Sequence, residues 1–337
     1  MKKLFQNGYI ALIITVLIIS VFIIDCKKDD NPVKYPYGIF PDTVVNLQGL
    51  NSAFDDYNST AYQLSGALSL IFSSNRKSSG GQFDLEQGLI TFNFNQTNGA
   101  FDLNTGMTQD AYLSKLIETA VTPGNDFGPY RLYSSIDGLE YLILSSENID
   151  GNLDLTYCKN VPQYGSNIPV IDGPYPVKLL NTDFDDAYLT FDLHQDSAYF
   201  TSNVDGNFDI YVKTRPAGKD ISTWFDSDYD VSSAVTSINS SSDDKCPMVY
   251  NKFMVFTSDR PGGYGGFDLY YSFFNNGEWS APVNFGPKIN TESDEYRPLI
   301  GYHSSFSNIF MIFSSNRTGG NGGFDLYFTG IDIPKLN

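Results

Sequence analysis

Nine carboxylates recur just ahead of short apolar runs, and carboxylates can ligate hard cations or serve as acid and base toward glycosidic bonds. They are Asp55, Asp56, Asp126, Asp185, Asp186, Asp243, Asp244, Asp294 and Glu295. If the apolar runs are the inner strands of a ring of sheets, these side chains form an acidic ring at a channel mouth. Such oxygen ligands suit calcium, whereas His194 and His303 are too separated for a typical zinc site. The alternative is structural, because Asn-Thr-x-x-Asp-Asp also forms a turn that caps the next repeat.

A second set of acidic residues follows loops that contain glycine: Asp84, Asp154, Asp209, Asp268 and Asp325. Glycines such as those in GGYGG (262 to 266) permit positive φ in a tight hairpin, and an aspartate just past the loop can accept its free backbone N–H groups. We therefore predict a structural role for these aspartates. Three arginines at equivalent loop positions are predicted to brace neighbouring loops; the alternative is an anion site built from their guanidinium groups. They are Arg76, Arg260 and Arg317.

Both sets belong to an internal repeat. The pattern FSSNR…GGFDLYF appears five times, at 72 to 85, 144 to 155, 200 to 210, 256 to 269 and 313 to 326. Within a repeat, short apolar and aromatic runs are broken by Gly, Pro, Asn and Asp, which is typical of strands and turns. Four antiparallel strands per unit predict an all-β, five-bladed β-propeller. The expected units are 50–122, 123–179, 180–237, 238–288 and 289–331.

The two ends of the repeat region predict how the ring closes. The last unit stops soon after its third strand and lacks an outer strand, whereas residues 43–51 match an outer strand but have no unit before them. We therefore expect the N-terminal strand to complete the last blade, which leaves no blade with an unpaired edge.

Together, FSSDRPGGxGGFDLY-like and INTxxDExxP-like motifs resemble the WD40-like repeats of the TolB propeller family, over nearly all of residues 43–331. That resemblance implies a periplasmic or outer-membrane-associated propeller that works as a protein-interaction platform and not as a catalyst.

At its start the chain carries a predicted targeting segment. Lys2 and Lys3 precede an apolar run that ends near Cys26, and the run is short for a spanning helix. This segment resembles a bacterial lipoprotein signal, which implies a signal peptide over 1–25, lipidation of Cys26 and a tether over 26–42. The alternative is an uncleaved signal anchor. Lys28, Asp29 and Asp30 resemble an acidic export tag of Bacteroidetes-type surface lipoproteins, so we expect an outer-membrane lipoprotein in the cell envelope, exposed at the cell surface.

Net charge and composition restrict the classes of molecule that the protein can bind. The 337 residues have a net charge of -18, which would repel nucleic acid. Cys158 and Cys246 lie in predicted strands and are expected to be buried free thiols. Two segments break the repeat symmetry: an insertion at 86–124, which contains a predicted helix at 110–120, and residues 303–310. Both segments, and Tyr264 at the tip of a loop, are candidate regions for contact with a partner.

From these observations we expect a protein-interaction or scaffolding module that is not an enzyme. The repeated carboxylates recur alike in every unit, whereas catalysis needs distinct groups in distinct blades, and GxSxG, P-loop and metalloprotease motifs are absent from the sequence. The alternative is a carbohydrate-binding or glycoside-hydrolysing surface protein. Carboxylates with flanking aromatic residues arranged asymmetrically would favour that alternative.

Overall fold

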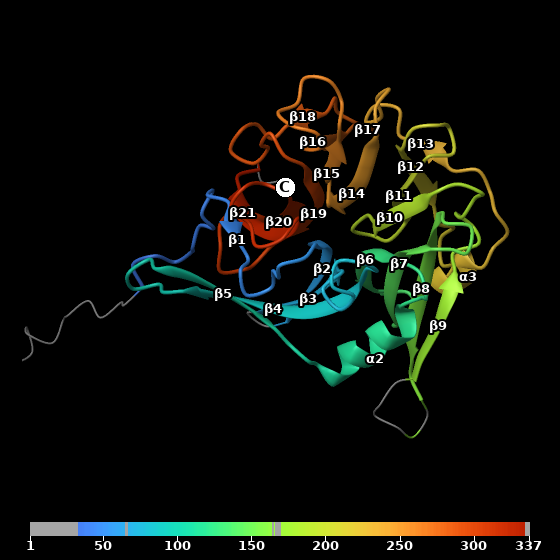
Figure 1. Ribbon diagram of the computed structural model, residues 1–337, viewed down its shortest axis with the longest axis horizontal. Coiled ribbons are helices and arrows are strands. Elements are labelled where there is room, and N and C mark those ends of the chain that lie inside the picture. The colour runs from blue at the N-terminus through green and yellow to red at the C-terminus, as the bar shows by residue number, and fades with distance from the viewer. Residues whose placement is uncertain (1–32, 65–66, 164, 166–169, 334–337) are drawn as a thin grey trace, which may run out of the picture.

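Five antiparallel sheets surround a common centre in the computed structural model, which describes residues 33–64, 67–163, 165 and 170–333 (Figure 1). This confirms the all-β, five-bladed propeller. The first three blades are β2 (Asp56–Leu64), β3 (Ala67–Ser74), β4 (Asp84–Phe94) and β5 (Phe101–Met107); β6 (Asp126–Tyr133), β7 (Glu140–Glu147), β8 (Leu153–Val161) and β9 (Val170–Pro176); and β10 (Asp186–Phe191), β11 (Ser197–Ser202), β12 (Asp209–Thr214) and β13 (Ser233–Ala234). Blades four and five are β14 (Asp244–Tyr250), β15 (Phe253–Ser258), β16 (Asp268–Asn275), β17 (Glu278–Trp279) and β18 (Val283–Asn284); and β19 (Glu295–Gly301), β20 (Ile309–Ser315), β21 (Asp325–Ile331) and β1 (Val45–Asn46).

The second strand of each blade forms its core. Strands β11, β15 and β20 are almost wholly buried, which explains their continuous apolar and aromatic runs. Each hydrophobic cluster between blades draws on neighbouring sheets: Phe72 of β3 and Phe328 of β21 share one with Phe40. The blades therefore stabilise one another through the apolar area buried between them.

The ring closes through the N-terminal strand, as predicted. β1 pairs antiparallel with β21, with Val45 opposite Phe328. The Asn51 side chain accepts from the Leu326 N–H at 2.8 Å and donates to the Leu326 carbonyl oxygen at 3.0 Å. Phe40 stacks on Phe306, with ring centroids 3.8 Å apart. The last blade is thus completed by residues from the other end of the repeat region.

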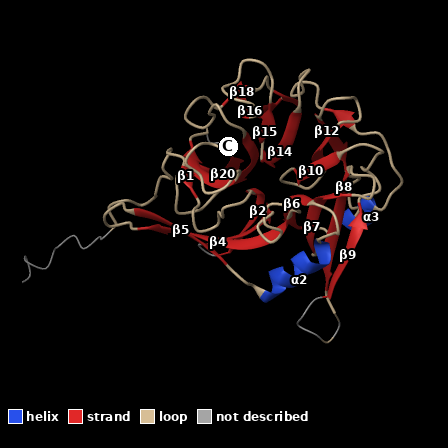
Figure 2. Cartoon of the chain, in the orientation of Figure 1, coloured by secondary structure: helices blue, strands red, loops and turns tan. Residues whose placement is uncertain are grey.

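The segment predicted as an insertion is mostly part of blade one. β4 extends to Phe94, and β5 returns as the outer strand, so that their hairpin projects from the ring (Figure 1). Only the region around helix α2 (Ala111–Ala120) is added to the blade, and α2 matches the predicted helix, capped by Asp110. A second helix that the sequence analysis missed, α3 (Ile221–Phe225), also lies at the periphery (Figure 2). The outer strand predicted in unit four is split into β17 and β18 because Pro282 and its neighbours do not continue the pairing.

Cys158 and Cys246 are buried free thiols, as expected. The predicted signal peptide, Cys26 and the first residues of the tether lie outside the described residues, so lipidation stays a prediction. In the part of the chain that the structure describes, neither helix is long and apolar enough to cross a membrane.

Candidate functional site

In each acidic pair, the first carboxylate binds the neighbouring blade. Asp294 Oδ1 accepts from the Phe267 N–H at 2.9 Å, and Asp55 Oδ1 accepts from the Phe324 N–H at 2.8 Å across the closure. Asp185 and Asp243 accept from equivalent backbone groups, and Asn125 does so in blade two. These side chains satisfy N–H groups that the strands leave unpaired.

The second carboxylate of each pair is fully buried beneath its own turn; these residues are Asp56, Asp126, Asp186, Asp244 and Glu295. In blade three, Asp186 Oδ2 accepts from the N–H of Thr182 at 2.6 Å and from its hydroxyl at 2.8 Å, and the other blades repeat this turn. The capping turn that sequence analysis left as an alternative is therefore present in the structure.

In three blades, an arginine from the loop also pairs with this buried carboxylate. Arg76 pairs with Asp56, Arg260 with Asp244 and Arg317 with Glu295. Each guanidinium group is held inside its own blade, so the three arginines do not come together as an anion site would require.

A converging ring of metal ligands is not formed by the nine carboxylates. Among the described residues, no three His, Cys, Asp or Glu side chains lie together as metal ligands would. The reason is geometric, because one carboxylate of each pair points to the neighbouring blade and the other is buried in its own turn. The nine carboxylates therefore do not form the acidic ring that was one interpretation of the sequence.

Blades two and three break the symmetry. Their loops carry Asn148 and Val204 where the others carry arginine. Burial without a cationic partner raises the pKa of Asp126 and that of Asp186 from 3.8 to about 6, although hydrogen bonds from the capping turns act in the opposite direction. These two carboxylates differ chemically from their counterparts, a difference that the repeat pattern alone concealed.

Two of the aspartates after the loops, Asp268 and Asp325, hold the loop backbone. Asp268 accepts from the N–H groups of Tyr264 at 2.7 Å and Gly265 at 3.2 Å, and from Asn284 Nδ2 at 2.7 Å. Asp325 makes the corresponding contacts in blade five, and Asp154 and Asp209 each accept from one asparagine side chain. The structure places Asp84 half-buried at the same point of blade one.

Replacing Asp268 with alanine is expected to lower the free energy of unfolding by about 1 to 3 kcal/mol, because the loop loses the hydrogen bonds that this buried carboxylate accepts. Urea denaturation would measure it. Asp183→Ala, an exposed turn residue, is the matched control, and equal losses in the two variants would contradict a special role for Asp268.

Unlike side chains fill the channel between the first strands. The third residue of each first strand has positive φ, and these residues are Asn58, Gly128, Tyr188, Cys246 and Arg297. A Cβ at position 128 would lie 2.5 Å from the Tyr188 ring, so glycine there makes room for it. The buried Arg297 guanidinium lies 5.4 Å from the Tyr188 ring centroid.

Half-buried aromatic rings pack together near the start of the first strands. Tyr57, Phe127 and Tyr296 belong to first strands, and the residues that directly precede third strands are Phe83, Phe208, Phe267 and Phe324. Lys245 Nζ lies 4.0 Å from the Phe208 ring centroid. The expected acidic mouth is thus an aromatic one, because the carboxylates turn into their blades.

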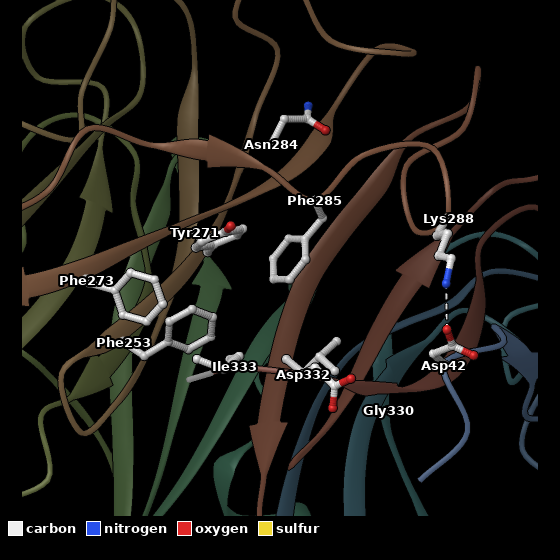
Figure 3. A pocket seen from close by; sticks show the side chains of 11 residues that line it. Asp42, Phe253, Tyr271, Phe273, Asn284, Phe285, Lys288, Gly330, Asp332 and Ile333 are labelled. Carbon is white, nitrogen blue, oxygen red and sulfur yellow. Dashed lines mark hydrogen bonds and ion pairs between the residues drawn. The ribbon is translucent and has the colours of Figure 1, made fainter. Parts of the chain in front are cut away.

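Between blades four and five lies a cleft of about 370 Å³, which we call the aromatic cleft (Figure 3). One wall carries Phe253 of β15, Tyr271 and Phe273 of β16, and Phe285, which follows β18. Opposite them lie three charged side chains, Asp42, Lys288 and Asp332, while Asn284 also lines the cleft.

The charged wall has a defined electrostatic arrangement. Lys288 Nζ lies 2.5 Å from Asp42 Oδ2, and this hydrogen bond holds the pKa of Asp42 below its usual value and raises the pKa of Lys288. Asp332 adds to the negative potential at the ammonium group. Asp42 is therefore an ionised acceptor at neutral pH.

The sequence analysis did not identify the aromatic cleft. A partial indication was available, because Tyr271 and Phe273 are two residues apart in a strand and so share one face. Asp42, Tyr271 and Asp332 come from three distant parts of the chain, and only the closed ring brings them together.

Comparisons with known proteins show the fold of the chain. No family model matches the sequence, so the TolB-like family is not supported, and no curated protein matches it either. Solved structures do match. The catalytic domain of a Coprinopsis cinerea GH62 alpha-L-arabinofuranosidase has a TM-score of 0.51 and 11% identity, over 87% of this chain and 97% of that one. An endo-arabinase from Bacteroides thetaiotaomicron has a TM-score of 0.50 and 9% identity, over 89% and 99%. Xyloglucan PUL GH43B of Bacteroides ovatus has a TM-score of 0.51 and 11% identity, over 87% of this chain and 55% of that one.

These matches correct two expectations. The interaction or scaffolding module was inferred from a resemblance that no family model supports. The absence of enzymatic activity was inferred also from the symmetry of the carboxylates and from missing motifs, whereas the matching solved structures are glycoside hydrolases. Envelope proteins as partners likewise find no support.

Proposed function

We propose that the protein binds a neutral glycan in the aromatic cleft. The observation that carries this proposal is the pairing of an aromatic wall with a polar wall across one concavity of about 370 Å³. A cavity of that volume lies within the range of sites that enclose small ligands. Nucleic acid, the other polymer that stacks on aromatic rings, is disfavoured by the net charge of -18.

Sugar chemistry fits the two walls. The C–H face of a pyranose or furanose ring is apolar and packs on aromatic rings such as Tyr271 and Phe285, while its hydroxyl groups need donors and acceptors at the edge. Asp42 and Asp332 provide acceptors, and Asn284 provides both an acceptor and a donor.

The comparisons supply the first glycans to test. The matching structures include an arabinofuranosidase, an arabinase and a protein named for xyloglucan. Arabinan and xyloglucan oligosaccharides are therefore the probes for this chain, although the likeness itself extends only to the fold.

Glycoside hydrolysis is a second candidate, favoured by two carboxylates that line the same cleft. In this candidate Asp42, which is hydrogen-bonded to Lys288, takes the role of base or nucleophile, and Asp332 takes that of the acid. This candidate would be supported if the wild type releases reducing ends from arabinan or xyloglucan, and if Asp332→Asn loses this activity but still binds the oligosaccharide. Turnover unchanged in that variant would contradict it.

Isothermal titration with oligosaccharides tests the binding proposal. We expect Phe285→Ala to weaken binding at least tenfold, because it removes a stacking surface. Lys288→Met is expected to weaken binding less, because the ion pair between Lys288 and Asp42 is exposed. Tyr264→Ala is the matched control, an exposed aromatic at a loop tip outside the cleft. Binding that is equally strong in all three variants, or absent from the whole panel, would overturn the proposal.

Lipidation of Cys26 and an outer-membrane location remain predictions. They would present the aromatic cleft to glycans at the cell surface, and the binding proposal does not depend on them.

A further inference from the structure

Blade three contains a cavity of about 220 Å³ that the proposed glycan site does not use. Its walls include the buried carboxylate of Asp186, the rings of Phe200 and Tyr211, and Val204. The cavity lies where an arginine side chain sits in blades one, four and five. What those arginines contact therefore shows what this cavity can hold.

In blade four, an arginine side chain occupies the equivalent site. Arg260 Nη2 lies 2.5 Å from Asp244 Oδ1 and donates to the Ile238 carbonyl oxygen at 2.7 Å. The guanidinium carbon lies 5.2 Å from the ring centroid of Phe256 and 5.0 Å from that of Tyr270. A carboxylate, a carbonyl oxygen and two aromatic faces thus surround the cation.

The same arrangement recurs in blade five. Arg317 Nη2 lies 2.9 Å from Glu295 and 2.7 Å from the Ile289 carbonyl oxygen, and its guanidinium carbon lies 5.1 and 4.9 Å from two ring centroids. The repeat therefore builds one type of guanidinium site more than once.

Blade three keeps these walls but lacks the arginine. Asp186, Phe200 and Tyr211 occupy the repeat positions of Asp244, Phe256 and Tyr270. Leu180 corresponds to Ile238, and Val204 replaces the arginine.

The carboxylate of this site has an unused acceptor. Asp186 is completely buried, and its Oδ1 atom has no hydrogen bond of normal geometry. Burial raises the pKa of this carboxyl group, although the nearby Ser202 hydroxyl lowers it. The corresponding Asp244 atom instead binds Arg260. A buried acceptor without a donor costs free energy that a ligand donor would recover. Asp205, which accepts from the Tyr211 hydroxyl at 2.7 Å, adds a second carboxylate to the cavity wall.

In blade two, the protein itself supplies donors to the equivalent carboxylate. There Asp126 Oδ1 accepts from the hydroxyl of Ser146 at 2.6 Å and from that of Thr122 at 3.1 Å, and Asn148 donates to Asp154 instead. Blade three therefore keeps the carboxylate, the carbonyl position and the two aromatic rings of the guanidinium site, but it lacks the arginine.

We propose that the blade-three cavity binds a guanidinium group supplied by another molecule. A guanidinium group fits better than an ammonium group, because its planar fork can bind Asp186 and the Leu180 carbonyl oxygen while its faces lie on Phe200 and Tyr211. The group could come from a small free guanidinium compound or from an arginine side chain of a peptide, and the experiment below separates these sources.

The test is isothermal titration of the full chain with ethylguanidinium chloride at constant ionic strength, with ethylammonium as the ammonium control. We expect one ethylguanidinium to bind, at least tenfold weaker binding in Asp186→Asn, and no binding in Val204→Arg, whose side chain fills the cavity. Arg260→Val, which opens the same cavity in blade four, is expected to bind a second equivalent.

A short peptide, acetyl-Gly-Arg-Gly-amide, identifies the source. Tighter binding than ethylguanidinium indicates a peptide arginine, and weaker binding indicates a small compound. The proposal is overturned if the wild-type chain binds ethylguanidinium no better than ethylammonium, or if Val204→Arg binds it as well as the wild type does. If Val204→Arg does not fold, Asp186→Asn decides, since unchanged binding in that variant also excludes the cavity. Glycan binding at the aromatic cleft is a separate readout and is expected to be unchanged in both variants.

Discussion

Replacing Arg260 with valine is expected to lower the free energy of unfolding by about 3 kcal/mol, the scale seen when one partner of a buried ion pair is removed. Asp244 is completely buried and pairs with Arg260 Nη2 at 2.5 Å. Without the guanidinium group, its negative charge keeps only the hydrogen bonds of the capping turn. The cation also loses its contacts with Phe256 and Tyr270, which adds to the loss.

Urea denaturation at pH 7 measures this effect. Lys178→Met is the control, because the ion pair between Lys178 and Asp226 is exposed, with side-chain exposures of 55% and 65%. Such surface pairs contribute about 0 to 1 kcal/mol. Similar losses in the two variants would show that Arg260 acts as an ordinary surface charge.

The second large effect is a loss of stability as pH rises from about 4 to about 7. Burial raises the pKa of Asp126 and that of Asp186 to about 6, above the ordinary value of 3.8. Below 3.8, both folded and unfolded chains hold these protons, so the carboxyl groups cause no penalty. Between the two values the folded chain holds more protons than the unfolded chain, so the free energy of unfolding falls as pH rises.

Above pH 6 the penalty is complete, on the order of 3 kcal/mol for each carboxyl group. The measurement is the free energy of unfolding at pH 4, 5, 6 and 7 for the wild type and for the double variant Asp126→Asn, Asp186→Asn. We expect the difference between the two proteins to change in favour of the variant across this range. Parallel curves would contradict the raised pKa values, whatever the absolute stability of the variant.

Much of the architecture follows from local sequence patterns. The spacing of the FSSNR…GGFDLYF motif determines the blades, and the outer strand missing from the last unit implies closure by β1. Capping by Asp186 and its counterparts was also available as an alternative, because an aspartate just after a turn can accept from the backbone N–H groups of that turn. These features depend on residues close in sequence or on the repeat itself.

Two sites depended on the tertiary structure. The aromatic cleft joins Asp42, Tyr271 and Asp332, which become neighbours only when the ring closes. The blade-three cavity depends on the replacement of an arginine by Val204, which in the sequence is merely an imperfect repeat and in the fold leaves Asp186 Oδ1 without a hydrogen bond of normal geometry.

The residues of the channel also show a property that the fold reveals and the sequence does not. Asn58, Tyr188 and Arg297 occupy one repeat position and look unrelated in the sequence, yet each has positive φ. The backbone N–H groups of Asn58 and Tyr188 bind hydroxyls of the preceding blade. Sequence by itself determined the repeating unit, because strands, turns and caps are formed by near neighbours. Tertiary structure decided which carboxylates are paired, what fills the channel and where a ligand can enter, because those properties depend on side chains that only the closed ring brings together.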